Sequence, residues 1–338
     1  MKRNVFLLTL AAVLLVGCGK HAGSPTGIEH FTTEVRLKTT PVKEQGRSDL
    51  CWDYAMLATI ETEHLMQGDS VNLSTDFVAR MLIQEEASEM FYTHKGRINT
   101  RGMMAMVPRL LATYGLTHYD AYHSSEATDY HLTERKVAQA VRTAMSYEQM
   151  SSRVNEILDK EIGACMPKVF MLGAVYTPLE FAHSVCHEDE YIAYTSFTHH
   201  LFGQAFPLET PDNHYHDTFL NVPIDTLMNI MEQSVRHGHP VCWEGDISEP
   251  GFSFEKGVAD ISTPLPADVQ KERQREFNNH QTTDDHCMEI VGIAHNHQGR
   301  KFFIMKNSWG TANPYHGFMY VSFDYVRLKT IAIMAKNV

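Results

Sequence analysis

Hydrophobic and polar residues alternate with helical spacing through the first half of the chain. In the first such region, Met56, Ile60 and Leu65 recur among acidic residues, which is typical of a half-buried helix. Polar residues at 72–76 supply an N-cap for the region that follows. The pattern predicts helices over residues 52–67, 76–89 and 102–114, and helical structure within residues 132–162 and 177–187.

The pattern changes to strands in the last third of the chain. From about residue 241 onward, short apolar runs are divided by turns, at residues 288–293, 302–306 and 317–321. Helices followed by strands indicate an α+β fold of two lobes with a cleft between them.

Three separated patches carry the groups of a thiol nucleophile site. Cys51 opens the first helix, whose positive N-terminal end stabilises a thiolate, and His286 opens an apolar strand and can remove the thiol proton. Asn307 can orient the imidazole from its other nitrogen under the cover of Trp309. Gln45, six residues before Cys51, can direct its amide at a developing oxyanion.

These motifs resemble those of the papain-type cysteine peptidases. The chain reads Gln45 and then Cys51-Trp52, followed far downstream by His286 and by Asn-Ser-Trp-Gly at residues 307–310. The resemblance implies that Cys51 is the nucleophile, His286 the base, Asn307 the orienting amide and Gln45 the oxyanion donor. It also implies that Trp52 and Trp309 support the site.

Within that family the chain is most similar to the bleomycin hydrolase or aminopeptidase C branch. The stretches that carry this likeness are residues 154–158, 176–181, 191–194, 221–225 and 238–243. The likeness implies a papain-like α+β fold, with a helical lobe over residues 34–118, a mostly helical insertion over 119–216 and a β-rich, barrel-like lobe over 217–338.

The sequence departs from the family pattern at three places. Residues 48–52 read Ser-Asp-Leu-Cys-Trp instead of Cys-Gly-Ser-Cys-Trp, so the usual disulfide cannot form and Asp49 and Leu50 are expected to alter the cleft. Cys51 and His286 lie 235 positions apart, more than the roughly 130–150 of a minimal enzyme, and the insertion explains the difference. The branch places its C-terminal carboxylate in the cleft to bind the substrate's amine, whereas residues 331–338 here are an apolar run that suits a closing strand.

The N-terminus predicts export and lipid attachment. Lys2 and Arg3 precede an apolar stretch at residues 5–16, which is typical of a signal peptide. The stretch ends in a sequence similar to the lipobox of bacterial lipoproteins, which predicts removal of residues 1–17, a lipid on Cys18 and a tether over 18–33. Gly19 resembles the residue of lipoproteins sent to the outer membrane. We therefore expect a bacterial cell-envelope protein anchored to the membrane, facing the periplasm or the exterior.

Composition and charge exclude some partners. The formal net charge of −12 argues against nucleic acid, and 43% hydrophobic residues suffice for a large core. Apart from Cys18 and Cys51, the four cysteines at 165, 186, 242 and 287 lack metal or redox spacing, and either a Cys165–Cys186 bridge or free thiols fits.

The twenty histidines include His199-His200 and three His-x-His pairs, but no HExxH motif or Cys/His cluster accompanies them. We therefore expect no metal and no cofactor. The expected function is a cysteine peptidase acting on peptides or proteins, with aminopeptidase action of bleomycin hydrolase type. The alternatives are a papain-like endopeptidase, a cysteine amidase or transferase, and a catalytically silent binding protein, and the oligomeric state, homo-oligomers included, stays open.

Overall fold

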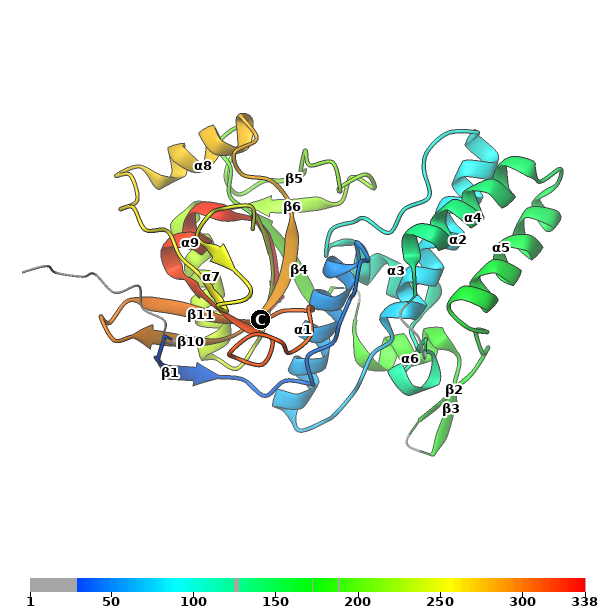
Figure 1. Cartoon of the computed structure of the whole chain (residues 1–338), viewed down its shortest axis with the longest axis horizontal. Helices are drawn as coiled ribbons and strands as arrows, with labels where there is room; N and C mark the ends of the chain where they lie inside the picture. The colour runs from blue at the N-terminus through cyan, green and yellow to red at the C-terminus, as the bar shows by residue number, and fades with distance from the viewer. Residues whose placement is uncertain (1–28, 125–127, 172, 188, 338) are drawn as a thin grey trace, which may run out of the picture.

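The protein has a helical lobe and a sheet lobe with one helix between them (Figure 1). The computed structural model describes residues 29–124, 128–171, 173–187 and 189–337. The intervening helix is α1 (Cys51–Gln67), which packs against the sheet on one side and against α2 and α3 on the other. The other elements of the helical lobe are α2 (Thr75–Thr93), α3 (Met106–Tyr114), η1 (Tyr119–Ala121), α4 (Tyr130–Thr143), α5 (Tyr147–Glu161), the hairpin β2 (Val169–Met171) and β3 (Ala174–Tyr176), and α6 (Pro178–Val185).

The sheet lobe is built on one mixed sheet. In spatial order its strands are β5 (Ala205–Pro207), β6 (Thr218–Asn221), β4 (Tyr191–Thr195), β13 (Thr330–Lys336), β7 (Val241–Gly245), β10 (His286–Asn296), β11 (Lys301–Lys306), β12 (Phe318–Ser322), β9 (Val258–Ala259) and β8 (Phe252–Ser253). The strand β1 (Phe31–Arg36) pairs with β10 off this path. Antiparallel pairing of β10 with both β7 and β11 puts β10 at the centre of the lobe.

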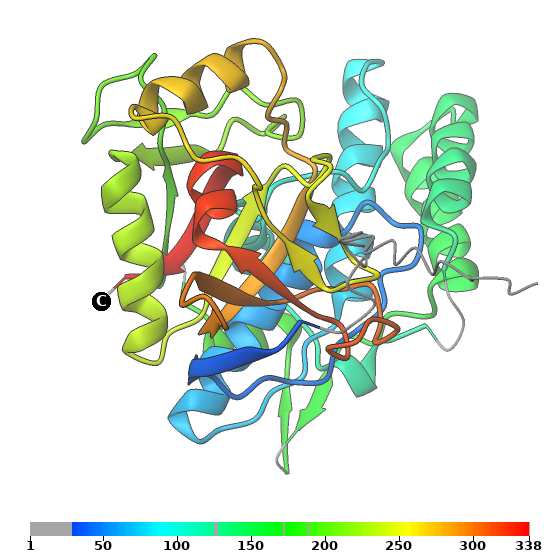
Figure 2. The ribbon, with the colours of Figure 1, turned by 60° about the vertical axis from the view of Figure 1, so that its left-hand side comes forward.

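Three helices complete the sheet lobe. The helix α7 (Ile224–Arg236) packs against β10 and β13, and Figure 2 shows it running along the sheet. The helices α8 (Val269–Asn278) and α9 (Phe323–Lys329) pack against each other. Burial of apolar side chains stabilises each lobe, since one hydrophobic cluster joins the helical lobe to α1 and a second lies between α7 and the sheet.

The predicted α+β class and the two lobes are confirmed, and most element boundaries differ by a few residues. The helix predicted over residues 102–114 begins later, at Met106. The larger difference concerns the segment 119–216, predicted as mostly helical. Its last part forms β4 and β5, and β4 pairs with β13 in the main sheet. The short strand at 191–195 carries a Tyr-Ile-Ala-Tyr run whose spacing does not distinguish a strand from a helix.

The chain's C-terminal run forms β13, as the apolar composition of residues 331–338 favours. Near the end of this strand the Lys336 ammonium binds Glu63, in the half of α1 farther from Cys51. Glu63 lies twelve positions after Cys51 along the helix, which is a rise of about 18 Å. The described part of the tail therefore does not reach Cys51.

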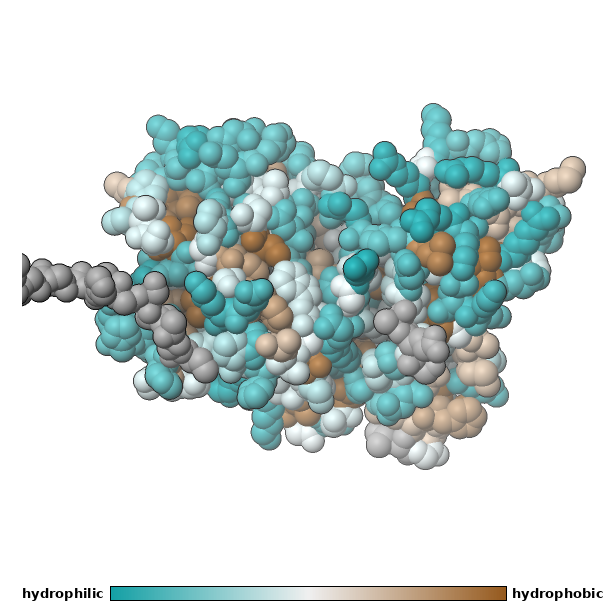
Figure 3. Space-filling model, viewed as in Figure 1, coloured by the Kyte–Doolittle hydropathy of each residue, from teal (hydrophilic) through white to brown (hydrophobic). Residues whose placement is uncertain are grey.

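Most of the surface facing the viewer in Figure 3 is hydrophilic. Hydrophobic residues are scattered over both lobes in this view, and one group lies at the lower edge of the helical lobe near β2 and β3, where Phe170 and Val175 are exposed. Among the described residues, no helix combines the length and the apolar character needed to cross a membrane. The predicted signal segment and Cys18 lie outside the described residues.

Candidate active site

Cys51 is the first residue of α1. The backbone carbonyl of Leu50 accepts the N–H groups of Asp53 and Tyr54, and no side chain caps this helix end. The N–H groups of the first turn that have no helical partner therefore face the position of the thiol, and such a helix end favours an anion. Leu50 is only 1% exposed and packs into the hydrophobic core.

The thiol of Cys51 lies beside two groups of β10. Hydrogen bonding from the Cys287 thiol, together with the hydrogen bond and the charge of His286, lowers the pKa of Cys51 well below its ordinary value, although burial opposes the shift. The pKa of Cys287 is raised well above its ordinary value, mainly by burial and then by the contact with Cys51. The arrangement thus favours a thiolate on Cys51 and a protonated thiol on Cys287.

His286 is held from its far nitrogen. Its Nε2 lies 2.7 Å from Oδ1 of Asn307, and both side chains are buried. The Trp309 ring covers the imidazole, with 4.5 Å between the ring centroids and an interplanar angle of 34°. Because Nε2 is engaged by an amide oxygen, Nδ1 is the nitrogen left for the Cys51 thiol.

Asn307 is itself fixed by the next residue. Its Oδ1 accepts the backbone N–H of Ser308 at 2.7 Å, in addition to the contact with His286. The strand pairing between β10 and β11 brings the ends of these two strands together, so His286 and Asn307 meet across neighbouring strands. The sequence motif around Asn307 therefore encodes both the orienting oxygen and its support.

Gln45 reaches the site through the segment that precedes α1. Its backbone N–H donates to the carbonyl of Ser308, and its Oε1 accepts from the Ser308 hydroxyl at 2.6 Å. Its Nε2 donates to the carbonyl of Ser48 at 2.9 Å. A carboxamide carries two N–H groups on this nitrogen, so one remains to be directed at an oxyanion. Ser308 is thus a positioning residue that the sequence reasoning missed.

Trp52 supports the site by anchoring the first turn of α1. It is completely buried, and its indole N–H donates to the carbonyl of Thr100 at 2.9 Å. This contact attaches the first turn of α1 to the helical lobe. Truncation of a buried tryptophan costs about 3–5 kcal/mol of stability, so Trp52 contributes to the fold that presents Cys51.

Acidic residues also lie near Cys51, and the sequence reasoning did not identify Glu244 among them. Glu244 on β7 is opposite Cys287 in the sheet register and is 3% exposed. Burial, followed by the charges of Asp284 and Cys51, raises the pKa of Glu244 well above its ordinary value. Burial and then the nearby Asp212 raise the pKa of Asp284 to about 6.

The pair Asp284-Asp285 comes directly before the strand that His286 opens, and the sequence alone predicts an exposed, solvated entry to that strand. That interpretation holds for Asp285, which is exposed and accepts from the Thr283 hydroxyl at 2.7 Å. It is wrong for Asp284, which is half-buried beside Asp212, because the segment before β10 turns this side chain inward. Asp212 in turn forms an ion pair with Arg101 at 2.7 Å.

The remaining cysteines are free thiols. The described cysteines are Cys51, Cys165, Cys186, Cys242 and Cys287, and none of these five forms a disulfide. Of the two possibilities for Cys165 and Cys186, the structure therefore contains the free thiols.

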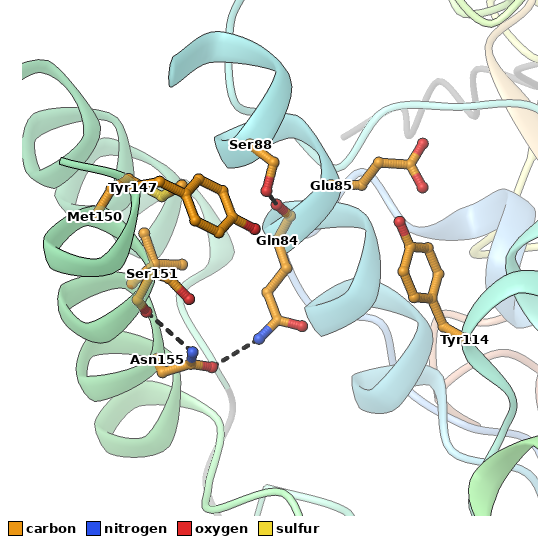
Figure 4. Close-up of a pocket in the computed structure, with 9 residues that line it drawn as sticks. Gln84, Glu85, Ser88, Tyr114, Tyr147, Met150, Ser151 and Asn155 are labelled. Carbon is orange, nitrogen blue, oxygen red and sulfur yellow. Dashed lines mark hydrogen bonds between the residues drawn. The ribbon is translucent and has the colours of Figure 1, made fainter. Parts of the chain in front are cut away.

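A separate cavity of about 320 Å³ lies in the helical lobe between α2 and α5 (Figure 4). Gln84 and Asn155 hydrogen-bond across it at 2.7 Å, while Tyr114 and Glu85 lie on its other side. Its lining includes none of Cys51, His286 and Asn307, so it is not part of the candidate active site.

The chain is similar to known proteins in part of its sequence and in its fold. A family model described as the peptidase C1-like family matches residues 167–336, which is half of the chain and includes His286 and Asn307 but not Cys51. The crystal structure of PepW from Lactobacillus rhamnosis HN001 is similar with a TM-score of 0.69 and 16% identity, over 90% of this chain and 82% of that chain. This likeness shows a shared fold.

Two weaker similarities were also found. The bromelain protease from Ananas comosus gives a TM-score of 0.45 at 14% identity, over 89% of this chain and 94% of that chain. A structure from work on the mite allergens Blo t 1 and Der p 1 gives a TM-score of 0.46 at 15% identity, over 94% of this chain and 74% of that chain. A search of curated proteins returned no match.

Proposed function

Because the chain belongs to the peptidase C1-like family, we propose that it is a papain-like cysteine peptidase whose nucleophile, base and orienting amide are Cys51, His286 and Asn307. The observation that carries this proposal is the arrangement around the imidazole. One ring nitrogen of His286 is held by Asn307 at 2.7 Å, while the hydrogen bonding and the charge of the same ring help to lower the pKa of the Cys51 thiol. This is the geometry that a thiolate–imidazolium pair requires.

The proposed reaction proceeds in two halves. The Cys51 thiolate attacks the peptide carbonyl, and the tetrahedral oxyanion is stabilised by the Gln45 amide and the backbone N–H of Cys51. The His286 imidazolium donates its proton to the leaving amine, which departs and leaves a thioester on Cys51. Water then loses a proton to His286 and attacks the thioester carbonyl, and the tetrahedral intermediate expels the Cys51 thiolate and releases the carboxylic acid. The proton taken from water stays on His286, which restores the thiolate–imidazolium pair.

We propose further that the enzyme acts as an aminopeptidase of bleomycin hydrolase type. In that branch the C-terminal carboxylate binds the amine of the substrate. The described C-terminal residues here do not support that mode of binding, since Lys336 lies beside Glu63, far from Cys51. The support comes from two acidic residues near Cys51, Glu244 and Asp284. Asp284 is half-buried near Glu244, and the charges of Asp284 and Cys51 both act on Glu244. An ionised carboxylate at this place would attract a substrate ammonium group.

The proposed location is the bacterial cell envelope, through a lipid on Cys18. The tether is predicted over residues 18–33, but the first described strand, β1, begins at Phe31, so the last three of these residues belong to the fold. Cys18→Ser should move the protein from the membrane fraction to the soluble fraction. Retention of the variant in the membrane fraction would remove the support for a lipid anchor.

Covalent labelling tests the peptidase proposal without knowledge of the substrate. A peptidyl electrophile that reacts with thiols should label the wild-type protein and fail to label Cys51→Ala. Cys165→Ala is the matched control, since Cys165 is also a free and partly exposed thiol, and it should label like the wild type. Equal labelling of Cys51→Ala would contradict the assignment, and absence of labelling in the wild type would favour a catalytically silent binding protein.

A further inference from the structure

We propose that His199, His200 and Glu209 bind a divalent transition-metal ion, with zinc as the best match. This proposal goes beyond the peptidase function and uses none of the active-site residues. One ligand atom from each of the three residues lies within 4.8 Å of the other two. The site is formed by the turn after β4 and the segment after β5.

The two imidazoles converge on one carboxylate. Nε2 of His199 lies 2.9 Å from Oε2 of Glu209, and Nε2 of His200 lies 2.6 Å from Oε1. Zinc bonds of about 2.0–2.1 Å in a tetrahedral site separate neighbouring ligand atoms by about 3.3 Å. Glu209 is 52% exposed and can move outward by this small amount, and the same exposure leaves a fourth position for water.

The orientation of His199 provides a second and independent observation. Its Nδ1 lies 3.2 Å from Oε1 of Gln274, and the same oxygen accepts the backbone N–H groups of Thr198 and His199. The Gln274 nitrogen donates to Asn278, so the amide orientation is set by its partners. Nδ1 must therefore be the protonated nitrogen of His199.

This hydrogen bond leaves Nε2 of His199 facing the Glu209 carboxylate. Two acceptors cannot bind each other directly, so either a proton or a metal cation must lie between them. A metal-binding histidine almost always donates its other ring N–H to a carboxylate, a carbonyl or water, which fixes the ring for coordination. Gln274 is placed as such a partner.

Aromatic packing and a buried arginine hold these groups in place. The His200 ring stacks on Phe206 with 3.9 Å between centroids, and the His199 ring stacks on Phe277 at 5.7 Å. Arg273, next to Gln274, is buried and donates to the backbone carbonyls of residues 327, 328 and 330. Rigid support of this kind lowers the cost of organising ligands around an ion.

The ligand types favour zinc over calcium or magnesium. The latter two ions prefer oxygen ligands, whereas imidazole suits zinc, copper and nickel. Two imidazoles with one carboxylate and an open position form a set that zinc accepts in proteins. Binding would join the turn at residues 198–203 to the segment after β5, so the bound ion should raise the thermal stability of the chain.

Zinc titration of the full chain in detergent tests the proposal. All proteins should carry Cys51→Ala, which removes the active-site thiolate as a competing ligand. The parent should bind one Zn²⁺ per chain, and His199→Ala, His200→Ala and Glu209→Gln should each weaken binding by about 100-fold or more. Gln274→Ala should weaken it by about 10- to 100-fold, as loss of an orienting partner does.

His295→Ala is the matched control, because His295 also pairs with a single carboxylate, that of Glu34. It should bind zinc like the parent, and all variants should melt like the parent without metal. Co²⁺ in place of zinc should give a tetrahedral absorption spectrum without a sulfur charge-transfer band. The proposal is overturned if the parent binds no zinc, if the three ligand variants bind like the parent, or if the cobalt spectrum shows a thiolate ligand.

Discussion

The imidazole of His286 lies 2.7 Å from the amide oxygen of Asn307, with both residues buried under Trp309. These two residues begin one strand and follow the end of its neighbour, so backbone pairing between β10 and β11 sets their separation. Asn307 also accepts from the backbone of Ser308, which prevents its amide from turning over. The imidazole is therefore positioned by the sheet before any substrate binds.

Loss of this contact should slow catalysis. We expect Asn307→Ala to lower kcat/KM by about 100-fold, because the imidazole loses the partner that fixes its orientation. Alkylation of Cys51 by iodoacetamide should still occur, at a lower rate. Steady-state kinetics on a peptide substrate and alkylation rates provide the measurements, and unchanged kinetics would exclude the orienting role.

Gln45 should act mainly on the transition state. Removal of one oxyanion donor costs about 10²–10³ in kcat, so Gln45→Ala should reduce kcat by that factor and leave KM nearly unchanged. Ser308→Ala removes the hydroxyl that holds the Gln45 carbonyl at 2.6 Å, and it should cause a smaller loss, about fivefold. A large rise in KM with constant kcat would instead assign Gln45 to substrate binding.

Cys287 should tune the nucleophile. Its thiol makes the largest contribution to the lowered pKa of Cys51, so Cys287→Ala should shift the midpoint of Cys51 alkylation to higher pH. The measurement is the rate of iodoacetamide alkylation as a function of pH. Cys186→Ala, which removes a buried thiol from the helical lobe, is the control and should leave the midpoint in place. An equal midpoint in Cys287→Ala and wild type would show that His286 alone sets the thiolate.

The preference of the enzyme for a peptide with a free N-terminal amine should depend on pH through Asp284. Burial and the neighbouring Asp212 raise the pKa of its carboxyl to about 6, so its negative charge develops as pH rises through that value. A substrate α-ammonium stays charged below about pH 7.7. The ratio of kcat/KM for a free peptide to that for its acetylated form should therefore rise between about pH 5 and about pH 7.

Asp284→Asn should remove this rise and lower the ratio at neutral pH by about 3- to 10-fold. The use of a ratio cancels the pH dependence of the catalytic step itself, which both substrates share. Asp285→Asn is the matched control, because Asp285 is exposed and adjacent. A ratio that does not change with pH in the wild type would remove Asp284 from amine recognition.

The sequence predicted the parts of the site that are encoded in local motifs. Cys51 at a helix start and His286 at a strand start follow from hydrophobic periodicity, and both lie where that pattern puts them. The α+β fold was also predictable, because helical spacing in the first half gives way to short strands after about residue 241. The likeness to PepW shows that this arrangement of elements is a known fold.

The missing parts depend on contacts between distant segments. Glu244 faces Cys287 only because β7 pairs with β10 in one register, and a shift by one residue would turn it away. Glu209 joins His199 and His200 only after the chain has turned back through β5. The sequence analysis searched for metal ligands by spacing along a strand, and that search cannot find a carboxylate brought in by a turn.

Cleavage of a matched pair of peptides tests the central claim most directly. One peptide has a free N-terminus and the other is acetylated, and both are incubated with the chain that starts after Cys18 and with its Cys51→Ala variant. The account predicts release of single residues from the free peptide and loss of all cleavage in the variant. Internal cuts in both peptides would replace the aminopeptidase by an endopeptidase, and cleavage that persists in Cys51→Ala would contradict the cysteine peptidase itself.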